Sequence, residues 1–399
     1  MTKIFAGLKV LDFTWAAAGP IVTKQLADNG ATVVKVESSR HPDSVRLGGP
    51  FKDDRPGLNR SGFFADFNSS KLGIAVDTNH PRAHEVLKPL VEWADIVADS
   101  FRPGVMERWG LGPDQLRAIN PSLITFSSSL YGADGPWSQH PGYGAQGAAL
   151  VGLHGMTGWP DRPPATPKGA YTDSVSPRYG AAALVAALIH RQRTGEGQHI
   201  DLSQIEATLN FLTPQLLSYQ QTGVIPERAG NRDPHAELHG VFACAGDDCW
   251  IAIEAWTGAA WSACVSVLGD GDGSDELQAP LSRIGEARER WIEERTKSWD
   301  AADLADALRS AGVAAGVVIK GSQMLAEPIL TARGHFWYLD HAEMGRLAYS
   351  GPAYRFERTP SELTRAAPIL GADTDDVLHA MLGFDDRRIA DLREAGVLR

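Results

Sequence analysis

The first forty residues of the chain alternate between short apolar runs and one amphipathic segment, and this alternation limits the possible folds more than any other feature. The run LKVLDF over residues 8–13 predicts a β-strand, and ATVVKVE over 31–37 predicts a second one. Between them, GPIVTKQLADNG over 19–30 predicts an α-helix, with Pro20 at its first position and Gly30 after its end. Two strands joined by a helical crossover lie parallel in one sheet. The sequence therefore predicts an α/β fold.

The same alternation continues further along the chain. Strands are predicted over 72–78, 95–100, 123–129 and 198–203, and helices over 81–94, after Asp173 and over 204–223. Ser176 and Pro177 have the residue types of an N-cap and a first helical position, so we expect the alanine-rich helix to begin there and not to need Asp173 as its cap. These elements predict a Rossmann-like parallel sheet covered by helices.

Ligands of open α/β sheets bind beyond the carboxyl ends of the strands. In this chain, those ends lead into residues 15–20, 37–40, 100–104 and 129–132. We therefore expect these four loops to line a cleft.

The pattern changes after residue 222. Residues 224–238 are rich in Pro, Gly and charge, which is typical of a linker. Beyond the linker, a hairpin is predicted over 239–256, and helices over 261–268, 284–297 and 301–311. We predict a large domain that begins with residues 1–222, a linker and small α+β domain over 223–325, and a return linker with a helical tail over 326–399.

Charge and composition exclude several classes of protein. The chain has 38 Lys and Arg residues against 49 Asp and Glu residues, a net charge of −11, and it has no basic run, which argues against binding to nucleic acid or to an anionic membrane. Three cysteines are too few for a disulfide framework, and the N-terminus lacks the pattern of a signal peptide. No apolar run approaches the ~20 residues that cross a bilayer. The simplest expected location is the cytoplasm.

Sequence motifs for common cofactors are also missing. The first predicted turn, TWAAAGP, has only Gly19 and is not the glycine fingerprint of dinucleotide enzymes. His235 and His239 have a spacing that could bind a metal on a helix, but Pro234 and Gly240 indicate a loop and no third ligand has matching spacing, so we predict no metal site. No Gly-x-Ser-x-Gly elbow is present.

Several residues at the predicted cleft allow two interpretations. Arg102 and Arg108 follow a strand end and could clamp phosphates, or they could be solvated surface charges. Lys71 has the same ambiguity. The small residues of TWAAAGP could let a phosphate or thioester approach the backbone, or could form a tight structural turn, and Trp15 could pack on an acyl group or in the core.

The order and spacing of several segments resemble the class III coenzyme A transferases (the CaiB/BaiF type), a family that includes formyl-CoA and carnitine-CoA transferases. The segments that carry the resemblance are LKVLDFTWAAAGPIVTKQLADNGATVVKVE, DSVR, NSSKLGIAVD, ADIVADSFRPGVMERWGLG, NPSLITFSSSLYGADGPW and GAYTDSVSPRYGAAALVAALIHRQRTGEGQHIDLS. Together they span nearly the whole chain.

The resemblance implies that Asp173 is a nucleophile. In such enzymes the carboxylate attacks an acyl-CoA thioester to give a mixed anhydride, and the released thiolate converts the anhydride to an aspartyl-CoA thioester. The partners would then be an acyl-CoA and a free carboxylic acid, with coenzyme A as a substrate and no tightly bound cofactor. The family also implies a large domain built from the N-terminal half and the C-terminal tail, and an interlocked dimer of identical or different chains.

The resemblance further implies which residues contact coenzyme A. By position these are Ala18, Arg40, Lys71, Ser100, Phe101, Arg102, Arg108 and Tyr131. Arg108 would contact phosphate, Tyr131 would face the thioester, and Arg40 would lie near the adenosine.

Two departures from the formyl-CoA transferases concern the acyl pocket, where we also expect Tyr143. Trp15 and Ala17 stand where those enzymes have a His and a Gln, and their glycine-rich flap is missing here. We therefore expect an acceptor acid larger or more apolar than formate or oxalate, such as a dicarboxylate or an aryl-substituted acid.

Two alternatives keep the same fold. The α-methylacyl-CoA racemases pair the aspartate with a histidine in a Gly-His-Asp context, whereas this chain has Gly142-Tyr143-Gly144, although His140 and His154 are near in sequence. The second alternative is a non-catalytic subunit of a hetero-oligomeric transferase. The presence of Asp173 argues against it, because a buried carboxylate without a partner destabilises a fold.

Overall fold

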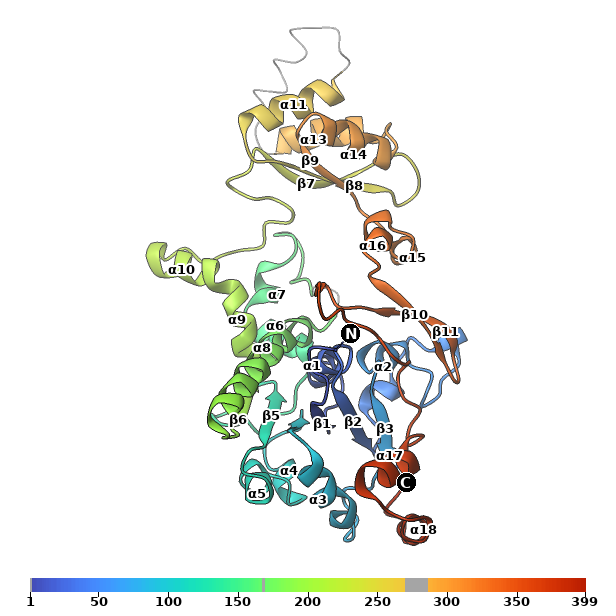
Figure 1. Cartoon of the computed structure of the whole chain (residues 1–399). Helices are drawn as coiled ribbons and strands as arrows, with labels where there is room; N and C mark the ends of the chain where they lie inside the picture. The colour runs from blue at the N-terminus through green and yellow to red at the C-terminus, as the bar shows by residue number, and fades with distance from the viewer. Residues whose placement is uncertain (1, 167–168, 270–285) are drawn as a thin grey trace. The chain divides into compact units, whose positions relative to one another are not determined.

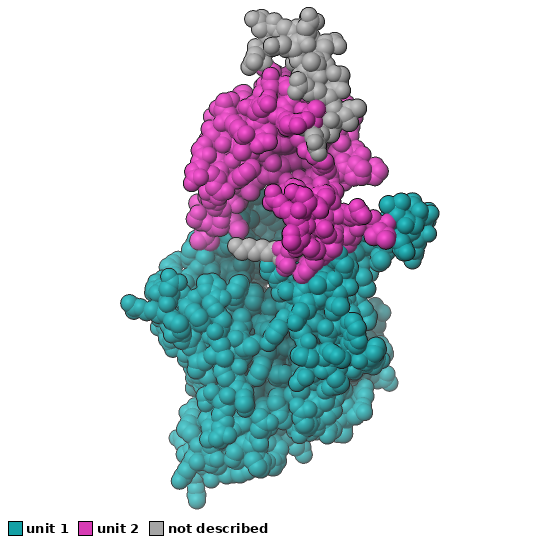
Figure 2. Space-filling model, turned by 180° about the vertical axis from the view of Figure 1, so that it is seen from behind, with its two compact units in different colours: residues 1–153, 167–224, 328–399 teal, residues 154–166, 225–327 magenta. Residues whose placement is uncertain are grey.

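The structure, a computed structural model, describes residues 2–166, 169–269 and 286–399 (Figure 1). The chain forms two compact units, coloured separately in Figure 2. The larger unit contains residues 1–153, 167–224 and 328–399, and the smaller contains 154–166 and 225–327. This division differs from the predicted one chiefly at 154–166, which the sequence assigns to the large domain.

The larger unit is built on a six-stranded parallel sheet in the order β3-β2-β1-β4-β5-β6. The strands are β1 (Lys9–Asp12), β2 (Thr32–Glu37), β3 (Leu72–Ala75), β4 (Ile96–Asp99), β5 (Ile124–Ser129) and β6 (His199–Ser203). The predicted α/β class is confirmed. The strand order reverses between β1 and β4, so the loops that follow these two strands open a crevice at the carboxyl edge of the sheet.

Helices cover both faces of this sheet. Side chains alternate along β1, so Val10 belongs to the core under α1 (Ala18–Ala27) and α8 (Tyr171–Thr194), and Leu11 belongs to the opposite core. The opposite core includes residues of α3 (His84–Trp93), α17 (Thr374–Leu382) and α18 (Asp386–Glu394). The C-terminal tail thus packs on the sheet formed by the N-terminal half.

The remaining elements of the larger unit are shorter. They are α2 (Gly62–Phe67), α4 (Val105–Arg108), α5 (Pro113–Ile119), α6 (Gly144–Leu150), α9 (Gln204–Leu209), α10 (Thr213–Thr222), α16 (Pro328–Ala332) and the hairpin β10 (Phe336–His341) with β11 (Gly345–Ser350). Helix α7 (Leu153–Met156) lies at the boundary between the two units.

Two helix predictions in the larger unit were wrong. Helix α8 begins at Tyr171 and not at Ser176, so Asp173 lies in its first turn and Pro177 lies inside it. Pro177 has no N–H and cannot donate the helical hydrogen bond to the backbone carbonyl of Asp173. The single helix predicted over 204–223 is broken between α9 and α10 by a 3-10 turn, because Pro214 starts a new helix near its N-terminus.

The smaller unit has a three-stranded antiparallel sheet in the order β7-β8-β9. Its elements are β7 (Leu238–Ala243), β8 (Trp250–Ala255), β9 (Ala314–Val317), α11 (Gly258–Leu268), α13 (Glu286–Thr296), α14 (Ala301–Ser310) and α15 (Gly321–Met324). The predicted hairpin is present, and Cys244 donates its N–H to the carbonyl of Cys249 across the turn (2.8 Å). The first two residues of the helix predicted over 284–297 lie outside the described residues.

The helices of the smaller unit pack on its sheet around Trp261, Trp291 and Leu304. Across the described residues of both units, no helix is long and apolar enough to cross a membrane.

Candidate active site

A cavity of about 100 Å³ lies in the larger unit beyond the carboxyl ends of β1, β4, β5 and β6. It is lined by Trp15, Ala16, Ala18, Ser100, Phe101, Arg102, Ser128, Ser129, Leu130, Tyr131, Ser138, His140, Gly142, Tyr143, Asp173 and Gln204. These residues come from the loops after β1 and β4, the end of β5, the loop before α6, and the first residues of α8 and α9. The cavity is therefore at the crevice that the strand order predicts.

Asp173 is the one carboxylate among the residues that line this cavity. Burial raises the pKa of its carboxyl to about 6, although hydrogen bonds from the side chain of Gln204 and from the backbone of Gly144 oppose the shift. Both of these donors are neutral. Asp173 is therefore ionised at neutral pH, yet it is more basic than an ordinary aspartate.

Thr172 fixes the orientation of the Gln204 side chain, which is one of the two donors to Asp173. The hydroxyl of Thr172 donates to Oε1 of Gln204 (2.9 Å), and its distance to the carbonyl of Gly144 is 3.3 Å. With Oε1 turned toward Thr172, the NH₂ group of Gln204 is the end that faces Asp173. Thr172 and Gln204 are both buried.

Gly144 approaches Asp173 more closely than any other residue type could. A Cβ atom added at Gly144 would lie 2.7 Å from Oδ2 of Asp173 and 2.7 Å from the Cβ of Ala170. The absent side chain lets the backbone N–H at the start of α6 reach the carboxylate.

The loop between β1 and α1 lines the other side of the cavity and is fixed by side chains from distant segments. The N–H of Trp15 donates to Oγ of Ser100 (2.7 Å), and that hydroxyl in turn donates to the carbonyl of Trp15 (3.1 Å). The N–H of Ala16 donates to Oδ1 of Asp43 (2.8 Å). Ala16 has a φ of 63°, in the left-handed region that non-glycine residues seldom adopt, so these contacts hold a strained turn.

A buried group of charges supports this loop. Nζ of Lys71 lies 2.9 Å from Oδ2 of Asp12, and Nζ of Lys35 lies 3.1 Å from Oδ2 of Asp43. Lys35 also donates to the carbonyl of Thr14 (2.5 Å). Burial alone would raise the pKa of Asp12, but Lys71 and Lys35 outweigh it and lower that pKa.

The predicted contact between Lys71 and coenzyme A does not fit this geometry. Its side chain is fully buried, and beyond Asp12 it donates to the carbonyl of Pro20 (3.0 Å), Oγ1 of Thr23 (2.7 Å) and Oδ1 of Asn68 (2.9 Å). Burial lowers its pKa to about 8, although Asp12 opposes that shift. Lys71 therefore holds the first turns of α1 in place through Pro20 and Thr23. Its ammonium group has no N–H left to donate to a phosphate.

Aromatic rings surround the cavity mouth. Trp15 meets Phe101 edge to face with ring centroids 5.1 Å apart, and Tyr131 meets Trp137 in the same way at 5.9 Å. Tyr143 also lines the cavity and is 64% exposed. These rings offer apolar surface to a bound acyl group.

The structure brings eight of the predicted site residues into the lining of this one cavity. They are Trp15, Ala18, Ser100, Phe101, Arg102, Tyr131, Tyr143 and Asp173. Ala17 is not in the lining, whereas its neighbours Ala16 and Ala18 are.

The two outer arginines also lie outside this lining. Arg108 is exposed and donates to the carbonyl of Gly104 (3.0 Å), and the side chain of Arg40 is 58% exposed with its Nε 3.7 Å from Asp77. Arg102, which does line the cavity, is exposed as well.

Sequence reasoning missed Gln204, Thr172 and Ser128, whereas Ser129 begins a segment that the sequence placed at the cleft. Ser128 and Ser129 line the cavity, and their buried hydroxyls have no hydrogen-bond partner within the part of the chain that the structure describes. The run SSS at a strand end was the available signal for the serines. Nothing near Gln204 in the sequence indicates that it meets Asp173, which is 31 positions earlier.

The two histidines named as alternatives, His140 and His154, lie in different units of the structure. His140 lines the cavity, whereas His154 belongs to the smaller unit. Within the described ranges, no group of three or more His, Cys, Asp or Glu side chains could hold a metal ion.

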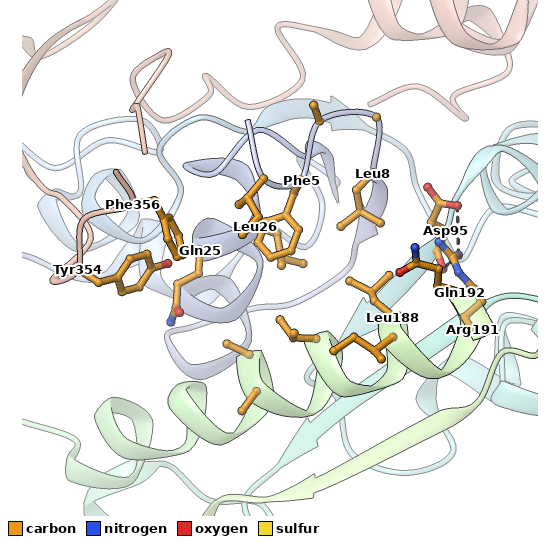
Figure 3. Close-up of a pocket in the computed structure, with 17 residues that line it drawn as sticks. Phe5, Leu8, Gln25, Leu26, Asp95, Leu188, Arg191, Gln192, Tyr354 and Phe356 are labelled. Atoms are coloured by element: carbon orange, nitrogen blue, oxygen red, sulfur yellow. Dashed lines mark hydrogen bonds and ion pairs between the residues drawn. The ribbon is translucent and has the colours of Figure 1, made fainter. Parts of the chain in front are cut away.

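A second, larger groove of about 1040 Å³ lies elsewhere on the larger unit (Figure 3). Figure 3 shows Tyr354 and Phe356 at one end, apolar side chains such as Leu26 and Leu188 along it, and the ion pair of Arg191 with Asp95 (3.1 Å) at the other end. Its surface is mostly apolar, and the carboxylate that lines it, Asp95, is paired with a cation.

Comparison with known proteins identifies relatives over the full length of the chain. The model of a family described as CoA-transferase family III matches residues 5–374. The succinyl-CoA–D-citramalate CoA-transferase of Chloroflexus aurantiacus is 29% identical over 395 residues, which cover 98% of this chain and 97% of that protein. The succinate–glutarate CoA-transferase of Agrobacterium fabrum is 30% identical over 383 residues, with 94% of each chain covered. A solved structure of a CaiB/BaiF family protein from Brucella suis has a TM-score of 0.83 at 28% identity, covering 96% of this chain and 100% of that chain.

Proposed function

We propose, from the premise that this chain belongs to CoA-transferase family III as its sequence predicted, that it transfers CoA from an acyl-CoA to a free carboxylic acid through a thioester on Asp173. Membership makes the chain a CoA-transferase; the intermediate and the acceptor are the proposal. The observation that carries it is the Asp173 carboxylate, which lines the crevice cavity and, among the described residues, accepts hydrogen bonds from the neutral donors Gln204 and Gly144.

The proposed chemistry exchanges acyl bonds of similar energy. An oxygen of Asp173 attacks the thioester carbonyl, a C–O bond forms, the C–S bond breaks, and the CoA thiolate leaves. The thiolate then attacks the Asp173 carbonyl of the mixed anhydride, which forms the aspartyl-CoA thioester and releases the donor acid as a carboxylate. The acceptor carboxylate reverses both steps. No proton is transferred overall, so the site needs no strong base.

The surroundings of Asp173 suit these steps. A carboxylate with a pKa of about 6 is a better nucleophile than an ordinary aspartate and is still ionised at pH 7. Neutral N–H donors can also stabilise the oxyanion that forms when the Asp173 carbonyl is attacked. An acyl group that fills this cavity would displace the water that could otherwise hydrolyse the anhydride.

The proposed contacts to coenzyme A follow the edge of the crevice. Arg102 at the cavity, with Arg108 and Arg40 further out, would bind the phosphates, since all three are at least partly exposed. The remaining proposed contacts are Ala18, Ser100, Phe101 and Tyr131, all in the cavity lining.

The proposed acceptor is larger or more apolar than formate or oxalate. Trp15, Phe101 and Tyr143 line the cavity with aromatic surface, which formate would leave uncovered. Two relatives are named for acids with more carbon atoms, citramalate and glutarate. We therefore propose a dicarboxylic or aryl-substituted acid as acceptor.

A substrate panel tests this proposal. Succinyl-CoA, acetyl-CoA and formyl-CoA would each be incubated with formate, oxalate, glutarate or phenylacetate, and the acyl-CoA products would be measured by mass spectrometry. We expect transfer to glutarate or phenylacetate to exceed transfer to formate and oxalate. Transfer that favours formate or oxalate contradicts the acceptor proposal, and no transfer to any acid contradicts the proposed reaction.

The racemase alternative is supported by one observation, the presence of His140 in the same cavity as Asp173. A racemase would exchange the α-proton of a branched acyl-CoA for deuterium in deuterated water. We expect no exchange, and exchange that is lost in His140→Ala would favour the alternative.

We also propose a dimer, which the apolar surface of the larger unit supports. Leu216, Leu217 and Tyr219 on α10 are each about half exposed, and the groove of Figure 3 is mostly apolar. Sedimentation equilibrium should give twice the 43.0 kDa chain mass. A monomer at micromolar concentration contradicts the dimer and leaves the proposed reaction unaffected.

A further inference from the structure

We propose that Gln204, oriented by Thr172, is a positioning residue that holds the Asp173 carboxyl in one orientation both in the free enzyme and in the covalent intermediate. The inference rests on the proposed function, because that function makes Asp173 the nucleophile. Neither residue was assigned a role by the sequence.

The backbone of Gln204 is fixed independently of its side chain. Gln204 is the first residue of α9 and is 8% exposed. Oγ of Ser203 accepts the N–H of Glu206 as the N-cap (3.4 Å), and the hydroxyl of Thr208 donates to the backbone carbonyl of Gln204 (2.9 Å). Its side chain therefore starts from a rigid position at the cavity wall.

The hydroxyl of Thr172 decides which end of the amide faces Asp173. It has one proton and two acceptors within reach, Oε1 of Gln204 at 2.9 Å and the carbonyl of Gly144 at 3.3 Å. Donation to the nearer acceptor keeps Oε1 on the Thr172 side and turns NH₂ toward Asp173. The opposite orientation would place Oε1 against the carboxylate, where two acceptors repel each other.

A neutral amide suits every species that Asp173 forms. The carboxylate, the mixed anhydride and the thioester each present an oxygen that accepts a hydrogen bond, so the same NH₂ orientation serves all three. A lysine or arginine would stabilise the free carboxylate most strongly and make it a weaker nucleophile, as Lys71 does for Asp12. A glutamate would repel the carboxylate. The site thus uses the donor type that discriminates least between the resting and covalent states.

The test compares two matched substitutions on the two sides of Gln204. Thr172→Val removes the hydroxyl that orients the side chain, and Thr208→Val removes a hydroxyl that contacts only its backbone carbonyl. Both threonines are fully buried, so the change in volume and burial is the same. The readout is the single-turnover rate of CoA loading onto Asp173 from succinyl-CoA between pH 5 and pH 9.

We expect Thr172→Val to slow loading by about ten- to a hundredfold, in the range found when a donor or its supporting residue is removed. The midpoint of its pH profile should move above pH 6, because the Gln204 hydrogen bond lowers the pKa of Asp173 and is lost. Gln204→Leu should behave in the same way. Thr172→Ser keeps the hydroxyl and should restore both rate and midpoint, and Thr208→Val should resemble the wild type.

Two results would overturn the inference. The first is an equal loss of loading rate in Thr172→Val and Thr208→Val with an unchanged pH midpoint. This result would mean that Thr172 contributes only to packing. The second comes from NMR titration of the Asp173 carboxyl carbon, which does not depend on activity: an unchanged pKa in Thr172→Val and Gln204→Leu contradicts the inference even if no donor loads the enzyme. Failure of wild-type protein to load CoA from any donor would instead reject the proposed function.

Discussion

Asp12 is a fully buried aspartate and Asp173 a partly buried one in the same unit, and their pKa values shift in opposite directions. Asp12, at the end of β1, contacts Lys71 at 2.9 Å and lies near Lys35, and these cations lower its pKa although burial alone would raise it. Asp173, in the first turn of α8, accepts hydrogen bonds from neutral donors among the residues that the structure describes, and burial raises its pKa to about 6. Burial therefore does not decide the character of a buried carboxylate. The charge of its partners does.

The two environments correspond to two tasks. The contacts of Asp12 join β1 to α1 through Thr23 and to the segment before β3 through Lys71, and Asp12 also accepts the N–H of Thr14 in the loop that lines the cavity. In the proposed function, the neutral contacts of Asp173 would orient the carboxylate and leave it nucleophilic. We infer that loss of the charged partners of Asp12 would lower stability. Disturbance of the neutral partners of Asp173 would instead lower activity.

The largest effect is expected from Asp173→Asn. It should lower the transfer rate by about 10⁴-fold or more, because removal of a nucleophile abolishes the covalent route. Its thermal unfolding midpoint at pH 8 should not fall, since a carboxyl whose pKa is raised in the folded state disfavours folding above its ordinary pKa. Activity assays and calorimetry measure the two quantities, and a large loss of stability would contradict the assignment of Asp173 to reactivity.

The opposite outcome is expected for Lys71→Met. Loss of the cation leaves Asp12 buried without its partner and should lower the free energy of unfolding by about 3–5 kcal/mol, the usual cost of breaking a buried ion pair. Urea denaturation measures this change. Lys297→Met breaks the exposed pair with Glu293 and serves as the control, with an almost unchanged midpoint. In the double variant Asp12→Asn/Lys71→Met, the unpaired buried charge is removed and part of the lost stability should return. No recovery would mean that the broken ion pair does not cause the loss.

A smaller loss of activity is expected for Gly144→Ala. The new Cβ would lie 2.7 Å from Oδ2 of Asp173, so the carboxylate must move and transfer should slow by about ten- to a hundredfold. Gly258→Ala is the matched control, because Gly258 is likewise the first residue of a helix, and a Cβ there meets nothing within 4 Å. Equal activity of the two variants would show that the close approach of Gly144 has no role in catalysis.

The smallest predicted effect comes from pH alone. The reactive form of Asp173 is the ionised one, so single-turnover loading should be complete above its pKa of about 6 and should fall about tenfold by pH 5. The lowered pKa of Asp12 keeps its own ion pair intact over this range. Loading that stayed constant down to pH 5 would mean that the pKa of Asp173 is not raised.

The sequence predicted those features of the fold that depend on local pattern. The apolar runs at 8–13, 31–37 and 95–100 became β1, β2 and β4, because a buried parallel strand is a short continuous apolar run between turn residues. The start of α8 was misplaced because Ser176-Pro177 is a frequent helix start, and only the tertiary structure reveals that Pro177 is tolerated inside this helix.

The candidate site was less predictable than the fold, since its contacts join distant residues. The catalytic role proposed for Asp173 comes from the family resemblance alone. Lys71 was misassigned because its partner Asp12 is 59 residues away and no local signal distinguishes a buried lysine from an exposed one. Gln204 was missed for the same reason.

The central claim is that Asp173 forms a covalent thioester with CoA, and trapping that intermediate tests it most directly. Wild-type protein, Asp173→Asn and Asp99→Asn would each be incubated with succinyl-CoA and then hydroxylamine, and their peptides would be mapped by mass spectrometry. Asp99 is the control because burial also raises its pKa to about 6, but it does not line the cavity of Asp173. The account predicts a hydroxamate at Asp173 in wild type and Asp99→Asn and none in Asp173→Asn. Turnover of succinyl-CoA without modification of Asp173 would contradict it.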